Sequence, residues 1–439
     1  MTASRRTAYL CLALLTFSSV ACLVNMSRSV HDNRQFGGTD LRVRVVGARA
    51  LMQGINPYTL ENQNAPSDRL IDPDRGRYNR CTYPPTLLSF YVPLAGLAYP
   101  SQRTLWMILE WAAILVSIGL LASQLNDRVS RCSFLAVAVG LFAGSQFWRL
   151  HVERGQYYVF VLLLLSLGIR ALRRRESSIL AGMCFGLAVC LRPPVICFLL
   201  PLWWSRHRKS LASAALTVVC GVLLSLSWGG ISYWSDFVSL SRSWETSILD
   251  GSFTEVSRRE EPREVDGYRP EILAVPAPNL SVASLVHDKL PESLRERPQI
   301  PATAIKIAWG VLTVLLLFVW LRPGRGKPRS LDSVLLCGTT LVLLTDYFLP
   351  IRISYADILF LIPLALHMPT LLQRQNRPLI GAIVLAFLPS LFPVSGLPWQ
   401  YWFITTALRS FVTLFVIVRL LLNDTSTSAE RDSPADLVT

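Results

Sequence analysis

The 439-residue sequence has few of the residues that build metal centres or disulfide frameworks. Its five histidines are scattered, and most of its nine cysteines lie within apolar blocks, with no Cys-x-x-Cys pair among them. This distribution argues against a histidine-based metal site and against a disulfide-stabilised fold. A glycine-rich nucleotide-binding loop and an ATPase motif are also absent. We therefore expect no metal-binding residues and no cofactor. Whether the activity depends on a metal ion stays open.

Charged residues are also scarce, at 16%, whereas apolar residues make up 51% and the mean hydropathy is +0.39. About a dozen near-continuous apolar blocks recur, most of them close to the ~20 residues that a helix needs to cross a bilayer. The two-residue alternation of a membrane barrel is absent. These patterns predict an all-α polytopic membrane protein with about 12 transmembrane helices.

The net charge of +14 does not point to nucleic acid in this context. The arginines lie mainly in short runs between apolar blocks, where they set topology and contact lipid head groups. Placing these runs in the cytoplasm puts both termini there as well. It predicts spans near 103–123, 133–150, 157–171, 178–191, 193–204, 210–232, 301–321, 331–349, 355–373, 378–395 and 399–421.

Two segments need separate interpretation under this topology. The apolar run of residues 7–26 is long for a signal peptide, the alternative reading, and we interpret it as an uncleaved anchor. Residues 84–99 cannot span in the same scheme, so we expect a short re-entrant or interfacial helix on the outer side. The alternative, that they do span, would place the arginine run around 170–175 outside. The chain then forms one transmembrane domain, 1–421, with external loops at about 27–83 and 233–300 and a disordered cytoplasmic tail, 422–439.

The stretch "GGTDLRVRVVGARALMQGINPYTL" places a lone acid, Asp40, at the start of the first loop. Apolar residues with roughly helical spacing follow it, which predicts an interfacial amphipathic helix that ends at Gly54. Asp40 could cap this helix or act as a base at the membrane surface, and the two roles are compatible. Three arginines, Arg42, Arg44 and Arg49, are expected to face lipid head groups.

Further polar residues interrupt the apolar blocks. Arg192, in "CLRPPVICF", is a charge in an apolar segment, and a planar guanidinium there suits a phosphate group. The predicted topology places this arginine on the outer face together with Asp40, Gln156, Asn279 and Asp357. A carboxylate base and a cationic phosphate site next to lipid suit transfer from a lipid-phosphate donor to an acceptor hydroxyl.

The order of motifs resembles the GT-C superfamily of membrane glycosyltransferases. The motifs "GINPY", "YPP", "GQ", "RPP", "NLS" and "ISYAD" resemble most closely the polyprenol-phosphate-mannose-dependent α-mannosyltransferases and their arabinofuranosyltransferase relatives, over roughly residues 36 to 365. The resemblance implies a GT-C-type helical bundle and an inverting transferase that needs no sugar nucleotide. It also implies that Asp40 is the catalytic base and that Arg192, where the family usually has lysine, binds the donor phosphate. Substrate-binding residues are expected at Tyr58, Tyr83, Gln156, Asn279, Ser281, Tyr355 and Asp357.

One motif departs from the family pattern, since Ser354-Tyr355-Ala356-Asp357 stands where the family carries Ser-Trp-x-His. We expect transfer of a sugar, mannose, from a polyprenyl-phosphate donor to a glycolipid or glycan acceptor, on the outer face of the cytoplasmic (plasma) membrane. A transporter or flippase of lipid-linked sugars and a non-catalytic membrane scaffold are the alternatives. A transporter of the inverted-repeat type should show paired broken helices in related halves, and the sequence has no clear repeat of that kind.

Overall fold

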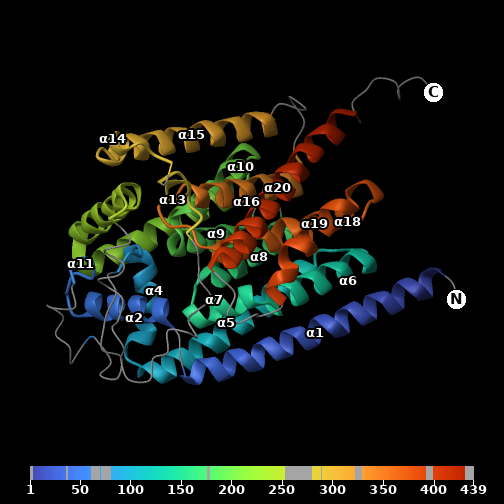
Figure 1. Ribbon diagram of the computed structural model, residues 1–439, viewed down its shortest axis with the longest axis horizontal. Coiled ribbons are helices and arrows are strands. Elements are labelled where there is room, and N and C mark those ends of the chain that lie inside the picture. Colours follow the sequence, from blue (N-terminus) through green and yellow to red (C-terminus); the bar gives the residue numbers. More distant parts are fainter. Residues whose placement is uncertain are drawn as a thin grey trace.

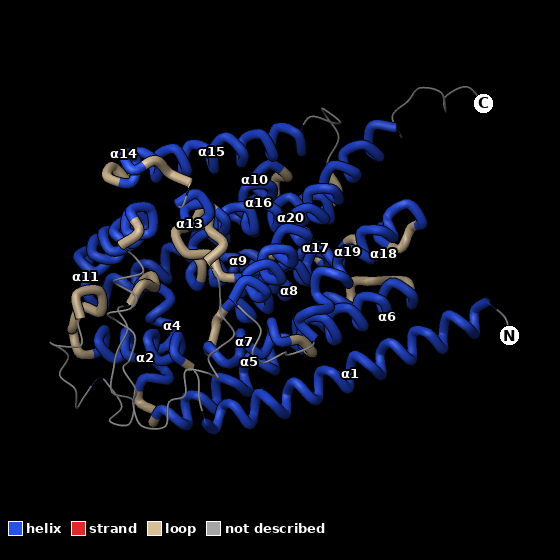
Figure 2. Tube along the Cα trace, in the orientation of Figure 1, coloured by secondary structure: helices blue, strands red, loops and turns tan. Residues whose placement is uncertain are grey.

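The computed structural model describes residues 3–35, 38–60, 70, 81–175, 178–252, 279–287, 289–321, 329–391 and 399–430. Throughout these ranges the regular elements are helices, and no strand occurs in them (Figures 1 and 2). The prediction of an all-α protein is therefore confirmed. The helices pack side by side as a bundle, and the long first and last helices, α1 and α20, run along it (Figure 1).

Five helices in the described part of the chain are long and apolar enough to cross a membrane. They are Cys11–His31 within α1 (Ala3–Gln35), α5 (Tyr99–Ala122), α11 (Arg208–Asp250), α15 (Gln299–Leu321) and Phe403–Leu422 within α20 (Trp399–Glu430). A sixth span results if α6 (Arg128–Val137) and η2 (Ala138–Ala143) are joined to α7 (Gln146–Arg154) across a 54° bend. The chain is thus a multi-pass membrane protein.

The predicted count of about 12 transmembrane helices is not confirmed. Several predicted spans correspond to helices shorter than the ~20 residues of a full crossing. Three of these, α8 (Tyr158–Arg174), α9 (Ile179–Leu191) and α16 (Leu331–Tyr347), have 17, 13 and 17 residues. Other predicted spans begin as 3-10 helices, namely η3 (Pro193–Phe198) before α10 (Leu199–Trp204) and η4 (Ser354–Phe360) before α17 (Leu361–Leu366). The rest of 355–391 holds α18 (Met368–Leu371), η5 (Arg374–Asn376), α19 (Arg377–Phe387) and η6 (Leu388–Leu391).

Residues 85–95 form α4 (Pro85–Ala95), a helix of 11 residues. Pro84 has an extended backbone, with ψ at 150°, and Pro85 occupies the first turn, where its missing N–H costs nothing. The length of α4 is about half of what a membrane crossing requires. A short helix here is what the sequence predicts for 84–99, although Tyr99 already belongs to the next helix, α5.

The first part of the expected second external loop, about 233–300, is helical. The helix α11 continues to Asp250 after a break at Gly230, whose φ of 68° and ψ of −165° are available to glycine but not to other residues. Two short helices, α13 (Val282–His287) and α14 (Glu292–Arg295), follow. Residues 253–278 lie outside the described part, as do residues 431–439 of the expected tail, whose first residues, 422–430, continue α20.

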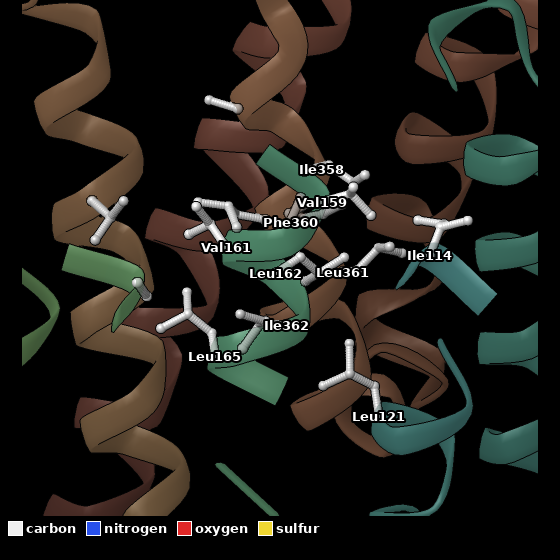
Figure 3. Close-up of a cluster of buried hydrophobic side chains, with 14 of the residues drawn as sticks. Ile114, Leu121, Val159, Val161, Leu162, Leu165, Ile358, Phe360, Leu361 and Ile362 are labelled. Atoms are coloured by element: carbon white, nitrogen blue, oxygen red, sulfur yellow. The ribbon is translucent and has the colours of Figure 1, made fainter. Parts of the chain in front are cut away.

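The apolar core places η4 against the N-terminal half of α8. Side chains of α5, α8, η4 and α17 interdigitate there (Figure 3), including Ile114, Val159, Leu162, Ile358 and Leu361. All five are fully buried. Because lipid is as apolar as these side chains, close packing rather than water exclusion holds such helices together. This packing brings the 354–357 segment next to the beginning of α8.

The helix predicted after residue 40 is present as α2 (Thr39–Met52), and it ends just before Gly54, which has φ of 68°. Its interfacial position stays a prediction. The predicted cap is wrong. Gly38 occupies the N-cap position in a left-handed conformation, and no side chain caps the helix. Asp40 lies in the first turn instead, because the backbone turns into the helix at Gly38, whose N–H is bonded to the carbonyl of Glu153. The carboxylate of Asp40 accepts a hydrogen bond from Gln156, from another part of the chain.

The predicted head-group-facing arginine stripe is also wrong for two of its three members. Arg44 is fully buried. Arg49 donates hydrogen bonds to the backbone carbonyls of Leu70, Ala95 and Leu97. The physical reason is that α2 packs against α4 and reaches α7, so that its polar side chains find partners inside the protein.

Candidate functional site

The beginning of α2 meets the end of α7 at a glycine. Gly155 ends α7 with φ of 67°, and a Cβ atom added there would lie 2.6 Å from Cβ of Leu41. The backbone N–H of Gly38 donates to the carbonyl of Glu153 at 2.5 Å. Glycine supplies both the left-handed conformation and the close approach that this junction needs. The junction brings the first turn of α2 to Gln156, the residue after Gly155.

Asp40 and Gln156 are in direct contact. The side-chain N–H of Gln156 donates to Oδ2 of Asp40, and Oε1 of Gln156 accepts a hydrogen bond from Nη2 of Arg44 at 2.8 Å. Since a guanidinium can only donate, it fixes the amide oxygen on its own side and turns the amide nitrogen toward the carboxylate. Oδ1 of Asp40 accepts no hydrogen bond from the described residues, and this side chain is only half-buried. One carboxylate oxygen is thus held in place while the other remains available to a substrate.

Arg44 is the centre of this arrangement. It donates from Nη1 to the carbonyl of Gly155 at 2.7 Å and from Nη2 to the hydroxyl of Tyr83 at 2.9 Å. The rings of Tyr83 and Tyr157 lie 4.3 and 4.8 Å from its Cζ atom. Burial disfavours the charged form, but the negative charge of Asp40 and the oxygens and ring faces of the surrounding tyrosines favour the cation, and the pKa of Arg44 stays above its ordinary value. The guanidinium therefore stays charged.

The two tyrosines predicted to bind substrate, Tyr58 and Tyr83, belong to the same neighbourhood. The hydroxyl of Tyr58 donates to the backbone carbonyl of Tyr83 at 2.7 Å. Burial raises the pKa of Tyr83, so that its hydroxyl stays protonated and neutral. Tyr58 thus positions the residue that contacts Arg44.

Arg192 follows the last residue of α9 and precedes Pro193, in an extended conformation. It is buried, and it forms an ion pair with Asp346 near the end of α16. Its Cζ atom lies 4.3 Å from the ring centroid of Tyr158. Its Nε atom is buried and has no hydrogen-bond partner in the described part of the chain. This arginine is therefore held inside the protein with donor capacity to spare, rather than reaching out to the membrane surface.

A stack of aromatic rings joins the two arginines. Tyr157 and Tyr158 stack with ring centroids 4.8 Å apart and an interplanar angle of 28°. Arg44 lies against Tyr157 and Arg192 lies against Tyr158, so the order is Arg44, Tyr157, Tyr158, Arg192. Cationic groups favour the faces of aromatic rings. The stack connects the Asp40 end of the site to the Arg192 end.

Tyr355 is the last predicted residue that joins this region. Its ring centroid is 5.9 Å from that of Tyr158, and it lies close to Asp40 and Gln156. Its hydroxyl is buried without a hydrogen-bond partner among the described residues. Asp40, Tyr58, Tyr83, Gln156, Arg192 and Tyr355 thus form one connected region.

The remaining predicted residues lie in a neighbouring cluster. Asn279 and Ser281 both donate side-chain hydrogen bonds to the carbonyl of Pro350, at 3.1 and 2.8 Å. Oδ1 of Asn279 also accepts from the backbone N–H of Arg352 at 2.9 Å. Asp357 accepts hydrogen bonds from Arg352 at 2.5 Å and from Ser410 at 2.6 Å. These contacts brace the loop before η4, and substrate binding by Asn279, Ser281 and Asp357 stays a prediction.

Sequence reasoning missed the roles of Arg44, Tyr157 and Asp346. Arg44 follows Asp40 by four residues, which places the two on one face of a helix, and this spacing could have pointed to it. Asp346 stands out in the sequence as an acid at the edge of an apolar block, but nothing there pairs it with Arg192. For Tyr157 the sequence carries no comparable signal. No group of three or more metal-ligating side chains occurs within the part of the chain that the structure describes.

Comparison with known proteins identifies the family. The sequence model of the family described as glycosyltransferase family 87 matches residues 82–346, which is more than half of the chain. No curated protein and no solved structure matches. The matched region contains Tyr83, Gln156 and Arg192, whereas Asp40 precedes it and Tyr355 follows it. The chain therefore belongs to glycosyltransferase family 87.

Proposed function

We propose that the protein transfers a sugar, mannose, from a polyprenyl-phosphate donor to a hydroxyl of a glycolipid or glycan acceptor at the outer face of the cytoplasmic membrane. Family membership supports glycosyl transfer in general. The observation that carries the finer proposal is the half-buried Asp40, which is held by Gln156 through one oxygen and is connected through stacked tyrosines to Arg192.

In the proposed mechanism Asp40 is the general base. Its available oxygen, Oδ1, accepts the proton of the acceptor hydroxyl as the hydroxyl oxygen attacks the anomeric carbon. The bond from that carbon to the donor phosphate oxygen breaks, and the electron pair leaves with the polyprenyl phosphate. Gln156 keeps Asp40 in place through Oδ2, so the attacking oxygen meets a carboxylate of fixed position.

Arg192 is proposed to stabilise the departing phosphate. A guanidinium is a planar donor that suits phosphate oxygens, and its charge offsets the charge that develops on the leaving group. The buried Nε atom of Arg192 offers a donor that no described residue uses. The face of the guanidinium rests on Tyr158, which restricts the directions in which its N–H groups point.

The proposal is tested by assaying purified Asp40→Asn protein in nanodiscs with mannosyl-phosphoryl-polyprenol as donor and a mannosylated glycolipid as acceptor. We expect transfer to fall by ~10³-fold, because asparagine cannot accept the proton. Asp250→Asn is the matched control, because Asp250 is exposed at the end of α11 and its loss should leave transfer unchanged.

Three results bear on the alternatives. Transfer by Asp40→Asn at the wild-type rate would show that Asp40 is not the base. Movement of a labelled lipid-linked sugar across vesicle membranes, without transfer, would favour a transporter. Binding of neither donor nor acceptor by the wild-type protein would favour a scaffold.

A further inference from the structure

A second cluster of buried charge surrounds Asp357, outside the contacts of Asp40. It consists of Arg352, Asp357, Arg409 and Ser410, here called the Asp357 cluster. Arg352 precedes η4, Asp357 lies within it, and the other two residues belong to α20. The side chains of Arg352, Asp357 and Arg409 are 1%, 0% and 6% exposed. Two buried cations therefore share one buried anion.

Arg352 makes the closer ion pair with Asp357. Its Nη2 atom donates to Oδ1 of Asp357 at 2.5 Å, and its Nη1 atom donates to the hydroxyl of Ser410 at 3.1 Å. The same hydroxyl donates to Oδ2 of Asp357 at 2.6 Å. The Cζ atom of Arg352 is 3.7 Å from the ring centroid of Tyr347. Each carboxylate oxygen thus accepts one short hydrogen bond from a group other than Arg409.

Arg409 has no hydrogen-bonded counter-ion in the described part of the chain. Its Nε atom is 3.9 Å from Oδ2 of Asp357, beyond hydrogen-bond distance, and has no other partner there. Its Nη1 atom donates to the neutral hydroxyl of Ser390 at 3.0 Å. The rings of Phe147 and Phe387 lie 4.8 and 5.7 Å from its Cζ atom. These contacts orient the guanidinium without cancelling its charge.

The nearest further carboxylate does not supply the missing anion. Asp346 acts on Arg352 electrostatically, but it is paired with Arg192. Counting Arg192, Arg352 and Arg409 against Asp346 and Asp357 leaves one positive charge uncompensated. A buried cation that shares its counter-ion with a second cation is unfavourable in a low-dielectric interior, and in membrane proteins such charges usually mark a functional site.

We propose that Arg352 and Arg409 bind a phosphate group, at a site separate from the donor phosphate site proposed at Arg192. The Nε atoms of both arginines are buried and unpartnered in the described residues, so each has an N–H group to offer. Guanidinium groups match phosphate oxygens in geometry, and a bound phosphate supplies the missing negative charge. The phosphate can belong to a lipid head group or be inorganic, and this site does not depend on the proposed transfer reaction.

The test uses the full-length protein in nanodiscs of phosphatidylcholine, with thermal unfolding as the readout. One arm adds inorganic phosphate, with sodium chloride of equal ionic strength as its reference. The other arm includes phosphatidic acid in the nanodisc. Ligand that binds the folded state raises its melting temperature with ligand concentration, so the arm that shows a saturable rise identifies the source of the phosphate.

Arg409→Gln is the decisive variant. We expect it to lose the phosphate-dependent rise while its ligand-free melting temperature is equal to or above that of the wild type, because one of two buried cations that share a single carboxylate has been removed. The double variant Arg192→Met/Asp346→Leu removes the other proposed phosphate ligand without leaving Asp346 unpaired, so the rise should remain in it and should disappear when Arg409→Gln is added. Arg419→Gln, which removes an exposed charge from the same helix, should behave as wild type.

Three outcomes would overturn the proposal. They are the absence of a rise in the wild-type protein with both phosphate sources, a rise that persists in Arg409→Gln, and a lower ligand-free melting temperature in Arg409→Gln, which would mark the arginine as a structural group. If Arg409→Gln does not fold, Arg409→Lys tests the same site. It keeps the positive charge but loses the planar guanidinium, so phosphate binding should weaken about tenfold, and unchanged binding would contradict the proposal.

Discussion

Arg44 donates a hydrogen bond of 2.8 Å from Nη2 to Oε1 of Gln156. This contact decides which end of the amide faces Asp40, because the guanidinium accepts nothing and holds the oxygen. The carboxylate of Asp40 consequently receives an N–H group rather than a lone pair. The orientation of the proposed base thus depends on a buried arginine that itself makes no hydrogen bond to the carboxylate among the described residues.

The first prediction concerns the amide. Gln156→Glu replaces the donating nitrogen by an oxygen, so two carboxylates would face each other in place of a hydrogen bond. We expect kcat to fall ~10²-fold, equivalent to about 2.7 kcal/mol, with little change in KM. Gln375→Glu, which adds the same charge at an exposed position, is the control. An unchanged kcat in Gln156→Glu would mean that the amide does not hold the base.

The second prediction tests whether Arg44 acts through Gln156. Lysine keeps the charge but cannot reach the carbonyl of Gly155, the hydroxyl of Tyr83 and Oε1 of Gln156 together. We expect Arg44→Lys and Gln156→Ala each to lower kcat by ~10- to 100-fold, and the double variant to be about as slow as Gln156→Ala alone. Kinetic assays of all four proteins complete the cycle. Additive losses would show that Arg44 acts independently.

The third prediction concerns the helix junction. Gly155→Ala places a Cβ atom 2.6 Å from Cβ of Leu41 at a residue with φ of 67°. We expect a loss of ~1–3 kcal/mol in stability and a larger relative loss of transfer, because α2 is pushed away from Gln156. Gly119→Ala is the matched control, since an added Cβ there meets no atom within 4 Å. Thermal unfolding and transfer assays together check this, and equal behaviour of the two variants would contradict it.

The fourth prediction separates stability from function at the buried pair of Arg192 and Asp346. Removing one partner leaves an uncompensated buried charge, so Arg192→Met and Asp346→Leu should each cost ~3–5 kcal/mol. The double variant should recover most of this stability, because neither charge remains. Transfer should stay undetectable in both variants that lack Arg192, since the proposed phosphate ligand is gone. Transfer at the wild-type rate by the stable double variant would remove Arg192 from the mechanism.

Hydropathy was sufficient to predict the class of fold, because lipid requires backbone groups to bond within helices. It did not predict where the helices within the apolar blocks end, and the predicted number of crossings is not confirmed. The stretch after Arg192 begins with two prolines and forms η3, and the stretch from Ser354 forms η4, so neither provides a single long helix. Hydropathy reports how apolar a segment is and carries little information on where its helix stops.

The candidate site was predicted in part, through residues whose chemistry is unusual for their surroundings. Asp40, Gln156, Arg192 and Tyr355 could be named from the sequence, and the structure brings them into one region. The partners could not be named. The hydrogen bond from Gln156 to Asp40 joins residues 116 positions apart, and the pair of Arg192 and Asp346 joins residues 154 positions apart. Such pairings follow from tertiary packing, which no local pattern encodes.

Three consecutive residues, Gln156, Tyr157 and Tyr158, make three different contacts, with Asp40, Arg44 and Arg192. An external loop can gain or lose residues, but one residue inserted or deleted here would shift every later contact by one position. Chain length between Gly155 and Tyr158 should accordingly be invariant among related enzymes that share this arrangement, even where side chains differ. This tripeptide is therefore a fixed point from which the sequences of distant relatives can be aligned.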